Sequence, residues 1–264
     1  MEEEEKLLNF IQIGEDASQI ENLYLVNSYY LFKNLQKTEW KIDWKTIILL
    51  FTLVDKPLSI ADLLKTWPFF RHYKDISPRL PPLLHFELIQ EEAGAKNAKI
   101  LQATTKGRYV VAFFFYIFAF DNEGFKKFSF LESQFHNLPG FNTVDDLFQS
   151  LKLIKSQVPA LLEITPKIQA VLEELNWKID SKLLLVPLYL LESEKQSYTD
   201  LIQNYPHFGY YRELKKRIIP LVSLNLVDEE KAGRKGSLLS LTRKGRMFLS
   251  LFAYLLGFPQ QPSK

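Results

Sequence analysis

The chain contains no cysteine among its 264 residues. This absence excludes disulfide bonds, thiolate metal sites and cysteine nucleophiles, and it agrees with a reducing cytosol. Long hydrophobic runs are also missing. The most apolar segments, residues 109–120 and 247–258, would extend only about 18 Å as helices, less than a bilayer requires. The N-terminus lacks the basic start of a secretory signal, because residues 2–5 are all glutamate. We therefore expect a cytoplasmic protein without a membrane span.

Motifs for catalysis are equally scarce. The four histidines, at positions 72, 85, 136 and 207, do not have the spacing of a metal-binding pair. The chain has no G-x-S-x-G nucleophile motif, no phosphate-binding loop and no glycine-rich dinucleotide fingerprint. We therefore predict that the protein is not an enzyme and uses neither a cofactor nor a metal ion.

What the sequence does contain is an internal repeat. Residues 62–120 align without a gap with residues 200–258, and 19 of the 59 aligned positions are identical. The phrase Trp-Lys-Ile-Asp at 40–43 returns at 177–180 and extends the match. An offset of 138 residues is far longer than the period of a solenoid, about 20–50 residues, so it indicates a duplicated domain. The predicted domains are residues 1–124 (core 40–120) and 143–264 (core 177–258), with a linker at 125–142.

Charge is unevenly distributed, although the net charge is only +2. The first core has 11 Lys and Arg against 7 Asp and Glu (net +4), and the second has 13 against 8 (net +5). The remaining segments have 9 against 16 (net −7). Basic cores permit contact with nucleic acid without requiring it.

Both cores predict the same order of secondary structure. An apolar helix precedes a Ser-x-x-Asp capping box, Ser59 to Asp62 or Ser197 to Asp200, which begins a short second helix. A third helical segment, two strand-like stretches and a closing apolar helix follow. The expected third helices are 75–86 and 210–224, and the expected strands are 88–92, 99–103, 226–230 and 237–241. Helical lead-ins are expected at 3–13 and 18–36, and again at 143–157 and 165–175. The predicted fold class is α+β, mostly α.

The segment 221–246 carries a resemblance to a known family. It reads Leu-Val-Ser-Leu-Asn-Leu-Val-Asp-Glu-Glu, then a basic loop with two glycines, and it ends in Leu-Thr-Arg-Lys-Gly-Arg. This run resembles the segment from recognition helix through wing in MarR-type and related winged-helix transcription regulators. The resemblance covers about 80 residues of each half at the superfamily level. It implies two tandem winged-helix domains, each able to place its third helix in the DNA major groove and its wing along the backbone.

Basic residues gather in the third helix of the second core. Leu214, Ile218 and Leu221 recur at i, i+4 and i+7 and should face the core, which leaves several cations off that stripe. These cations could contact DNA, and the plainer interpretation is that they only solvate an exposed helix face. The sequences Lys106-Gly107-Arg108 and Lys244-Gly245-Arg246 open the closing helices, where backbone N–H groups and cations could bind a phosphate. The plainer interpretation of this glycine is a steric need at a strand-to-helix junction. The candidate DNA-binding residues of the second copy are Arg212, Lys215, Lys216, Arg217, Arg234, Lys235, Lys244 and Arg246.

The first copy has fewer cations here: Arg71, Lys74 and Arg79 are the main candidates near its third helix, and the DNA-binding residues predicted for this copy are Arg79 and Lys96. Pro78 and Pro81 stand where the second copy has Lys216 and Ile219. With Pro82, they remove hydrogen-bond donors that a helix interior needs, so we expect the third helix of the first copy to be short or kinked. Lys96 lies in a small basic loop that is either a phosphate contact or an ordinary hairpin turn.

The sequence thus predicts a DNA-binding tandem winged-helix protein, a transcription regulator that acts as a fused pseudo-dimer on double-stranded DNA. Its closing helices, at 109–120 and 247–258, are apolar on every face, so each should bury against the other repeat or against a second chain. The alternative is a non-catalytic protein-interaction subunit, as in the endosomal sorting machinery or in polymerase-associated subunits. An interaction subunit would show its cationic surface interrupted by acidic or apolar residues.

Overall fold

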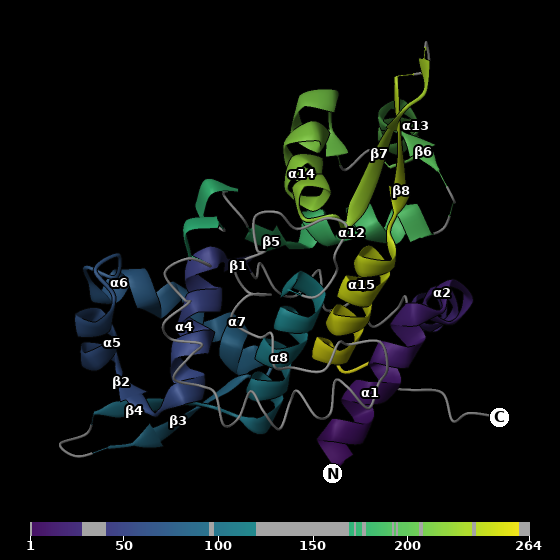
Figure 1. Ribbon diagram of the computed structural model, residues 1–264. Helices are drawn as coiled ribbons and strands as arrows, with labels where there is room; N and C mark the ends of the chain where they lie inside the picture. Colours follow the sequence, from purple (N-terminus) through teal and green to yellow (C-terminus); the bar gives the residue numbers. More distant parts are fainter. Residues whose placement is uncertain are drawn as a thin grey trace. The chain divides into compact units, whose positions relative to one another are not determined.

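The computed structural model describes residues 2–27, 41–94, 98–119, 169–171, 173–175, 178–191, 193, 195–205, 208–233 and 236–258. The chain divides into two compact units. The first unit includes the described residues 41–119, and the second includes the described residues 2–27 and 179–258. Both are mixtures of α and β that are mostly helical, which confirms the expected class (Figure 1). The expected linker at 125–142 and lead-in at 143–157 lie outside the described residues.

The first unit is built around an apolar helix. Strand β1 (Lys41–Asp43) leads into α4 (Trp44–Asp55). Asp43 is the N-cap of this helix, and its carboxylate accepts a hydrogen bond from the Thr46 backbone N–H. Most of the apolar residues of α4 are buried, so this helix forms the centre of the core. The elements that follow are β2 (Leu58–Ser59), α5 (Ile60–Thr66), α6 (Tyr73–Ile76), the 3-10 helix η1 (Ser77–Arg79), α7 (Leu80–His85), β3 (Ile89–Ala93), β4 (Lys99–Ala103) and α8 (Thr105–Ala119).

The second unit has the same order of elements after an additional pair of helices. That pair is α1 (Glu2–Glu15) and α2 (Ala17–Val26). The later elements are β5 (Lys178–Asp180), α12 (Ser181–Leu191), β6 (Gln196–Ser197), α13 (Tyr198–Asn204), α14 (Tyr211–Ser223), β7 (Val227–Lys231), β8 (Ser237–Leu241) and α15 (Arg243–Leu255). A single helix, α14, thus stands where the first unit has α6, η1 and α7.

The sheets of the two units agree in register. Each is a three-stranded antiparallel sheet, with order β2-β4-β3 in the first unit and β6-β8-β7 in the second. Ile89 pairs with Ala103, and Val227 pairs with Leu241, so both partners shift by the offset of the repeat. The two-residue strands β2 and β6 were not predicted from the sequence. Each strand ends at the N-cap serine of its capping box, Ser59 or Ser197, and both boxes form as expected.

The expected break in the third helix of the first unit is confirmed, and the prolines explain where it falls. Pro78 lies at the start of η1, and Pro81 and Pro82 lie in the first turn of α7. The backbone N–H groups of a first turn have no intrahelical acceptor, so proline is tolerated there. Restarting the helix twice therefore accommodates all three rings. By contrast, α14 continues through Pro220 without interruption.

Each closing helix begins with a junction that only glycine can fill. A Cβ placed on Gly107 would lie 2.1 Å from the carbonyl oxygen of Leu88, and one on Gly245 would lie 2.1 Å from that of Leu226. The Oγ1 of Thr242 accepts a hydrogen bond from the Gly245 backbone at 3.0 Å. These contacts support the steric interpretation of the glycine over the phosphate-binding one.

The two N-terminal helices lie in the second unit, where α1 packs along α15 (Figure 1). Leu7, Phe10 and Ile11 of α1 are buried. Gly14 permits close approach, because a Cβ there would lie 2.6 Å from the Ser250 hydroxyl. The sequence instead suggested that this segment belongs with the first core. In the structure, buried apolar residues of α1 and α2 pack against α15 within the second unit, and the burial of α15 against the other repeat or a second chain stays a prediction.

Candidate nucleic-acid interface

Helix α14 separates the core-facing residues from the basic ones. Leu214, Ile218 and Leu221 are buried, as the i, i+4, i+7 pattern indicated. The opposite face exposes the three cations Arg212, Lys215 and Lys216. This face is not purely basic, because three large apolar or aromatic side chains are exposed on or beside it. These are Tyr210 at 68%, Tyr211 at 50% and Ile219 at 51% exposed.

Glu213 is the one acid of α14, and it partly neutralises the helix. Its carboxylate lies 3.6 Å from Lys216 Nζ and 3.1 Å from Arg217 Nη1. The hydrogen bond from Arg217, followed by the charge of Lys216, lowers the pKa of Glu213. Arg217 also donates to the Glu213 backbone carbonyl at 3.2 Å, and its side chain is only 22% exposed. Arg217 is therefore held in an intrahelical contact with Glu213.

A chain of contacts supports the ring of Tyr211. The buried ring of Tyr198, the first residue of α13, lies 5.1 Å from that of Tyr211 at an angle of 54°. The Tyr198 hydroxyl donates to Glu229 of β7 at 3.3 Å, and burial followed by the Glu229 charge raises the pKa of Tyr198. Lys215 Nζ lies 5.8 Å from the centre of the Tyr211 ring. The two contacts of Tyr198 were not predicted, because they join residues of three different elements, whereas the Lys215–Tyr211 contact lies within α14 at i, i+4 spacing.

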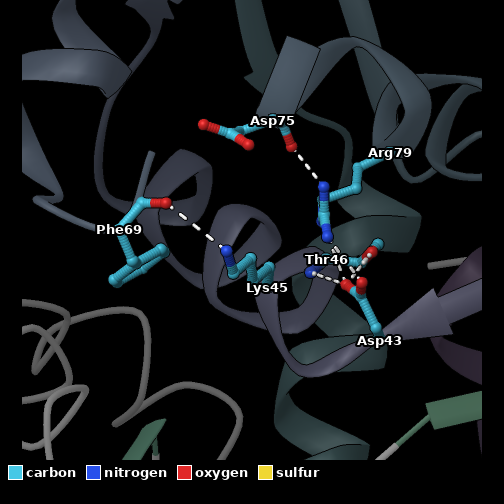
Figure 2. A network of polar contacts seen from close by, with 6 residues as sticks. All are labelled: Asp43, Lys45, Thr46, Phe69, Asp75 and Arg79. Carbon is cyan, nitrogen blue, oxygen red and sulfur yellow. Dashed lines mark hydrogen bonds and ion pairs between the residues drawn. The ribbon is translucent and has the colours of Figure 1, made fainter. Parts of the chain in front are cut away.

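In the first unit, Arg79 occupies an internal ion pair (Figure 2). Its Nη2 and Nε lie 2.6 and 3.0 Å from the two carboxylate oxygens of Asp43, and its Nη1 donates to the backbone carbonyl of Asp75. Both side chains are largely buried, at 18% and 16% exposed. Burial alone would raise the pKa of Asp43, but the Arg79 hydrogen bonds and charge, with further hydrogen bonds from Thr46, lower it overall. Arg79 thus joins the N-cap of α4 to the helical segment formed by α6 and η1.

The other candidates fall into two groups. Lys244 is only 5% exposed and Arg246 is half-buried, so the junction does not present both cations to solvent. Lys106 of the first unit, which aligns with Lys244, is also mostly covered, with a side chain that is 14% exposed and an Nζ that lies 3.8 Å from the Glu87 carboxylate. The remaining candidates, Lys96, Arg234 and Lys235, lie outside the described residues.

The surface of the first unit that corresponds to α14 keeps its aromatic residue and loses most of its charge. Tyr73 aligns with Tyr211 and is 58% exposed. Lys74 aligns with Arg212 and is exposed, but Ser77 and Pro78 replace the two lysines. Among the residues that the structure describes, three predicted cations therefore come together only on α14.

Within the described part of the chain, no group of three or more His, Cys, Asp or Glu side chains could hold a metal ion. No helix of the described residues is both long enough and apolar enough to cross a bilayer. Comparisons of the whole chain with protein-family models, with curated proteins and with solved structures give no match.

Proposed function

We propose that both units are winged-helix domains and that the protein binds double-stranded DNA chiefly through α14, as a transcription regulator. The common order of elements and the common strand register support the tandem arrangement. In a winged helix, α14 would be the recognition helix, and the β7–β8 hairpin would be the wing.

The observation that carries this proposal is the exposed basic face of α14. Arg212, Lys215 and Lys216 occupy the first half of a 13-residue helix whose opposite face is buried. Helices that read a major groove use mainly their N-terminal part, where cations reach base edges or phosphates. Glu213 withdraws charge from this face, yet its carboxylate contacts Lys216 and Arg217 and leaves the other two cations available.

The first unit contributes less in this proposal. Its third helical segment restarts at Ser77 and Leu80, so it presents no continuous helix for a groove. Its best-placed arginine, Arg79, is already paired with Asp43. The pseudo-dimer is therefore functionally asymmetric, with the second unit as the reader.

Titration of the full chain with a random-sequence duplex at low salt tests the proposal. We expect measurable binding, and we expect the Arg212→Ala/Lys216→Ala variant to bind more weakly at every salt concentration. Gln12→Ala is a suitable control, because Gln12 is an exposed residue of α1 in the same unit. The proposal fails if the unmutated protein shows no binding at low salt, or if the double variant binds as well as the control.

A second candidate function is protein interaction without DNA. The observation in its favour is that Tyr210 and Ile219 interrupt the basic face, with exposed fractions of 68% and 51%. Tyrosine and arginine are common anchors of protein interfaces. A failure of the duplex titration would favour this candidate.

A further inference from the structure

The two tyrosines at the start of α14 have no obvious role on a closed duplex. Tyr210 is the N-cap residue and Tyr211 the first residue of the helix, and both are at least half exposed. In a closed duplex the faces of the bases are covered by their neighbours. An aromatic side chain gains stacking energy only against a base that is unpaired or splayed out.

We propose that Tyr210 and Tyr211 form a stacking platform for unpaired bases, so that the preferred ligand of the second unit is DNA with an opened segment. This inference rests on the proposed DNA-binding function and specifies its substrate. A duplex that contains a run of unpaired bases supplies both a backbone for the cations and free base faces for the rings.

The Tyr211 ring of this platform is held in place before any ligand binds. One edge of the Tyr211 ring is supported by Tyr198, and Tyr198 is itself fixed by its hydrogen bond to Glu229. Half of the Tyr211 side chain nevertheless remains open to solvent. A ring that is already held in place loses little conformational freedom on binding, which favours stacking.

Cations accompany the rings on the same turn and the next. Arg212 follows Tyr211 directly and is exposed, and Lys215 lies one turn on, with its Nζ 5.8 Å from the Tyr211 ring centre. Exposed aromatic rings interleaved with cations are typical of surfaces that bind single-stranded nucleic acid, where the cations contact phosphates and the rings stack on bases.

The first unit provides an internal comparison. It keeps the tyrosine, as Tyr73, but the residue that aligns with Tyr198 is Ile60, and Ser77 aligns with Lys215. An isoleucine and a serine provide neither a supporting ring nor a cation. The supported platform is therefore a property of the second unit, and Tyr73 is a matched control for Tyr211.

The experiment compares two labelled DNAs of the same length and salt conditions: a fully paired duplex, and the same duplex with a central stretch of mismatched bases. We expect the full chain to bind the mismatched DNA about tenfold more tightly, since each stacked base contributes roughly that much or more. Tyr210→Ala/Tyr211→Ala should remove this preference and change affinity for the paired duplex less than twofold. Tyr211→Phe should retain it, because the ring remains, and Tyr73→Ala should leave it unchanged.

The possible failures are distinguishable. If the protein binds both DNAs equally, or if the double tyrosine variant weakens both to the same extent, the platform is overturned and the proposed DNA binding stands. If the protein binds neither DNA, both proposals fall. Circular dichroism of each variant checks that it is folded, which we expect because the replaced side chains are exposed.

Discussion

At the scale of single residues, the identities shared by the two copies have different physical causes. Gly107 and Gly245 are glycines because a carbonyl oxygen occupies the place of a Cβ. Arg79 and Arg217 both donate to the backbone carbonyl four residues earlier. Their carboxylate partners differ, since Arg79 binds Asp43 and Arg217 binds Glu213. Shared basic residues are therefore partly structural in this protein.

The glycine at the junction can be tested by adding one methyl group. Gly107→Ala should destabilise the first unit by about 1–3 kcal/mol, because the new Cβ forces α8 away from Leu88, the residue before β3. Urea unfolding, followed by the fluorescence of Trp44 and Trp67 in that unit, measures the change. Thr105→Ala, at the exposed start of the same helix, is the control and should have a much smaller effect. Equal stability of Gly107→Ala and the control would contradict the steric explanation.

The Asp43–Arg79 pair predicts a dependence of stability on pH. The folded pKa of Asp43 is lowered, so the pair stabilises the fold above the unfolded pKa and loses its effect as the pH falls below about 4. At neutral pH, Asp43→Asn should cost about 2–3 kcal/mol, less than the 3–5 of a fully buried pair, because both side chains retain some exposure.

Measurement of the unfolding midpoint in urea across this pH range tests the pair. The difference between the Asp43→Asn variant and the unmutated protein should shrink as the pH falls, because protonation of Asp43 removes the same charge. A difference that is independent of pH would show that the Asp43 charge does not stabilise the first unit.

At the scale of elements, the structure explains the two adjacent glutamates that each core carries at the same place. Glu91 and Glu92 lie on β3, and Glu229 and Glu230 lie on β7, in each case an edge strand of its sheet. An exposed edge offers unpaired backbone groups to another chain, and charged side chains oppose such pairing. The acids therefore protect the edges, and Glu229 also orients Tyr198.

Local patterns predicted these elements well. The Ser-x-x-Asp boxes, the prolines of the third helix and the Thr-x-Lys-Gly-Arg junction each act within a few residues, so their consequences can be inferred from the sequence. The docking of α1 on α15 could not be inferred in this way. The apolar faces of these helices indicate that each must pack against another element, but they do not specify which element. The site followed the same division, since the exposure of Arg212 was predictable and the support of Tyr211 by Tyr198 was not.

The packing of α1 on α15 gives a prediction at this scale. Phe10 is fully buried, and its ring lies 5.8 Å from that of Tyr254 in an edge-on contact. Phe10→Ala should destabilise the second unit by about 3–5 kcal/mol, from lost burial and the cavity left behind. Hydrogen–deuterium exchange should then be faster in peptides of α15 and unchanged in peptides of α4. Exposed Gln12→Ala is the control, and unchanged exchange in α15 would contradict the assigned packing.

At the scale of the whole molecule, two units with the same order of elements have diverged in charge on one equivalent surface. The second unit presents Arg212, Lys215 and Lys216 on a continuous helix, while the first presents Lys74, Ser77 and Pro78 on a broken one. Their nearly equal net charges, +4 and +5 over the two cores, hide this difference. In the proposed function, local arrangement, more than total charge, makes the second unit the one that binds DNA.

This asymmetry makes a quantitative prediction for the salt dependence of duplex binding. Each phosphate contact contributes about 0.9 to the slope of log K against log salt concentration, so Arg212→Ala/Lys216→Ala should lower that slope by up to about 1.8. The comparison in the first unit is Arg71→Ala/Lys74→Ala, which also removes two exposed cations, although only Lys74 aligns with a replaced residue, and it should leave the slope nearly unchanged. Removal of Lys216 leaves Glu213 paired with Arg217, so no unpaired carboxylate is created that would itself repel DNA. Equal reductions of the slope in the two double variants would show that both units contact the DNA backbone, and DNA binding would then belong to both units and not chiefly to the second.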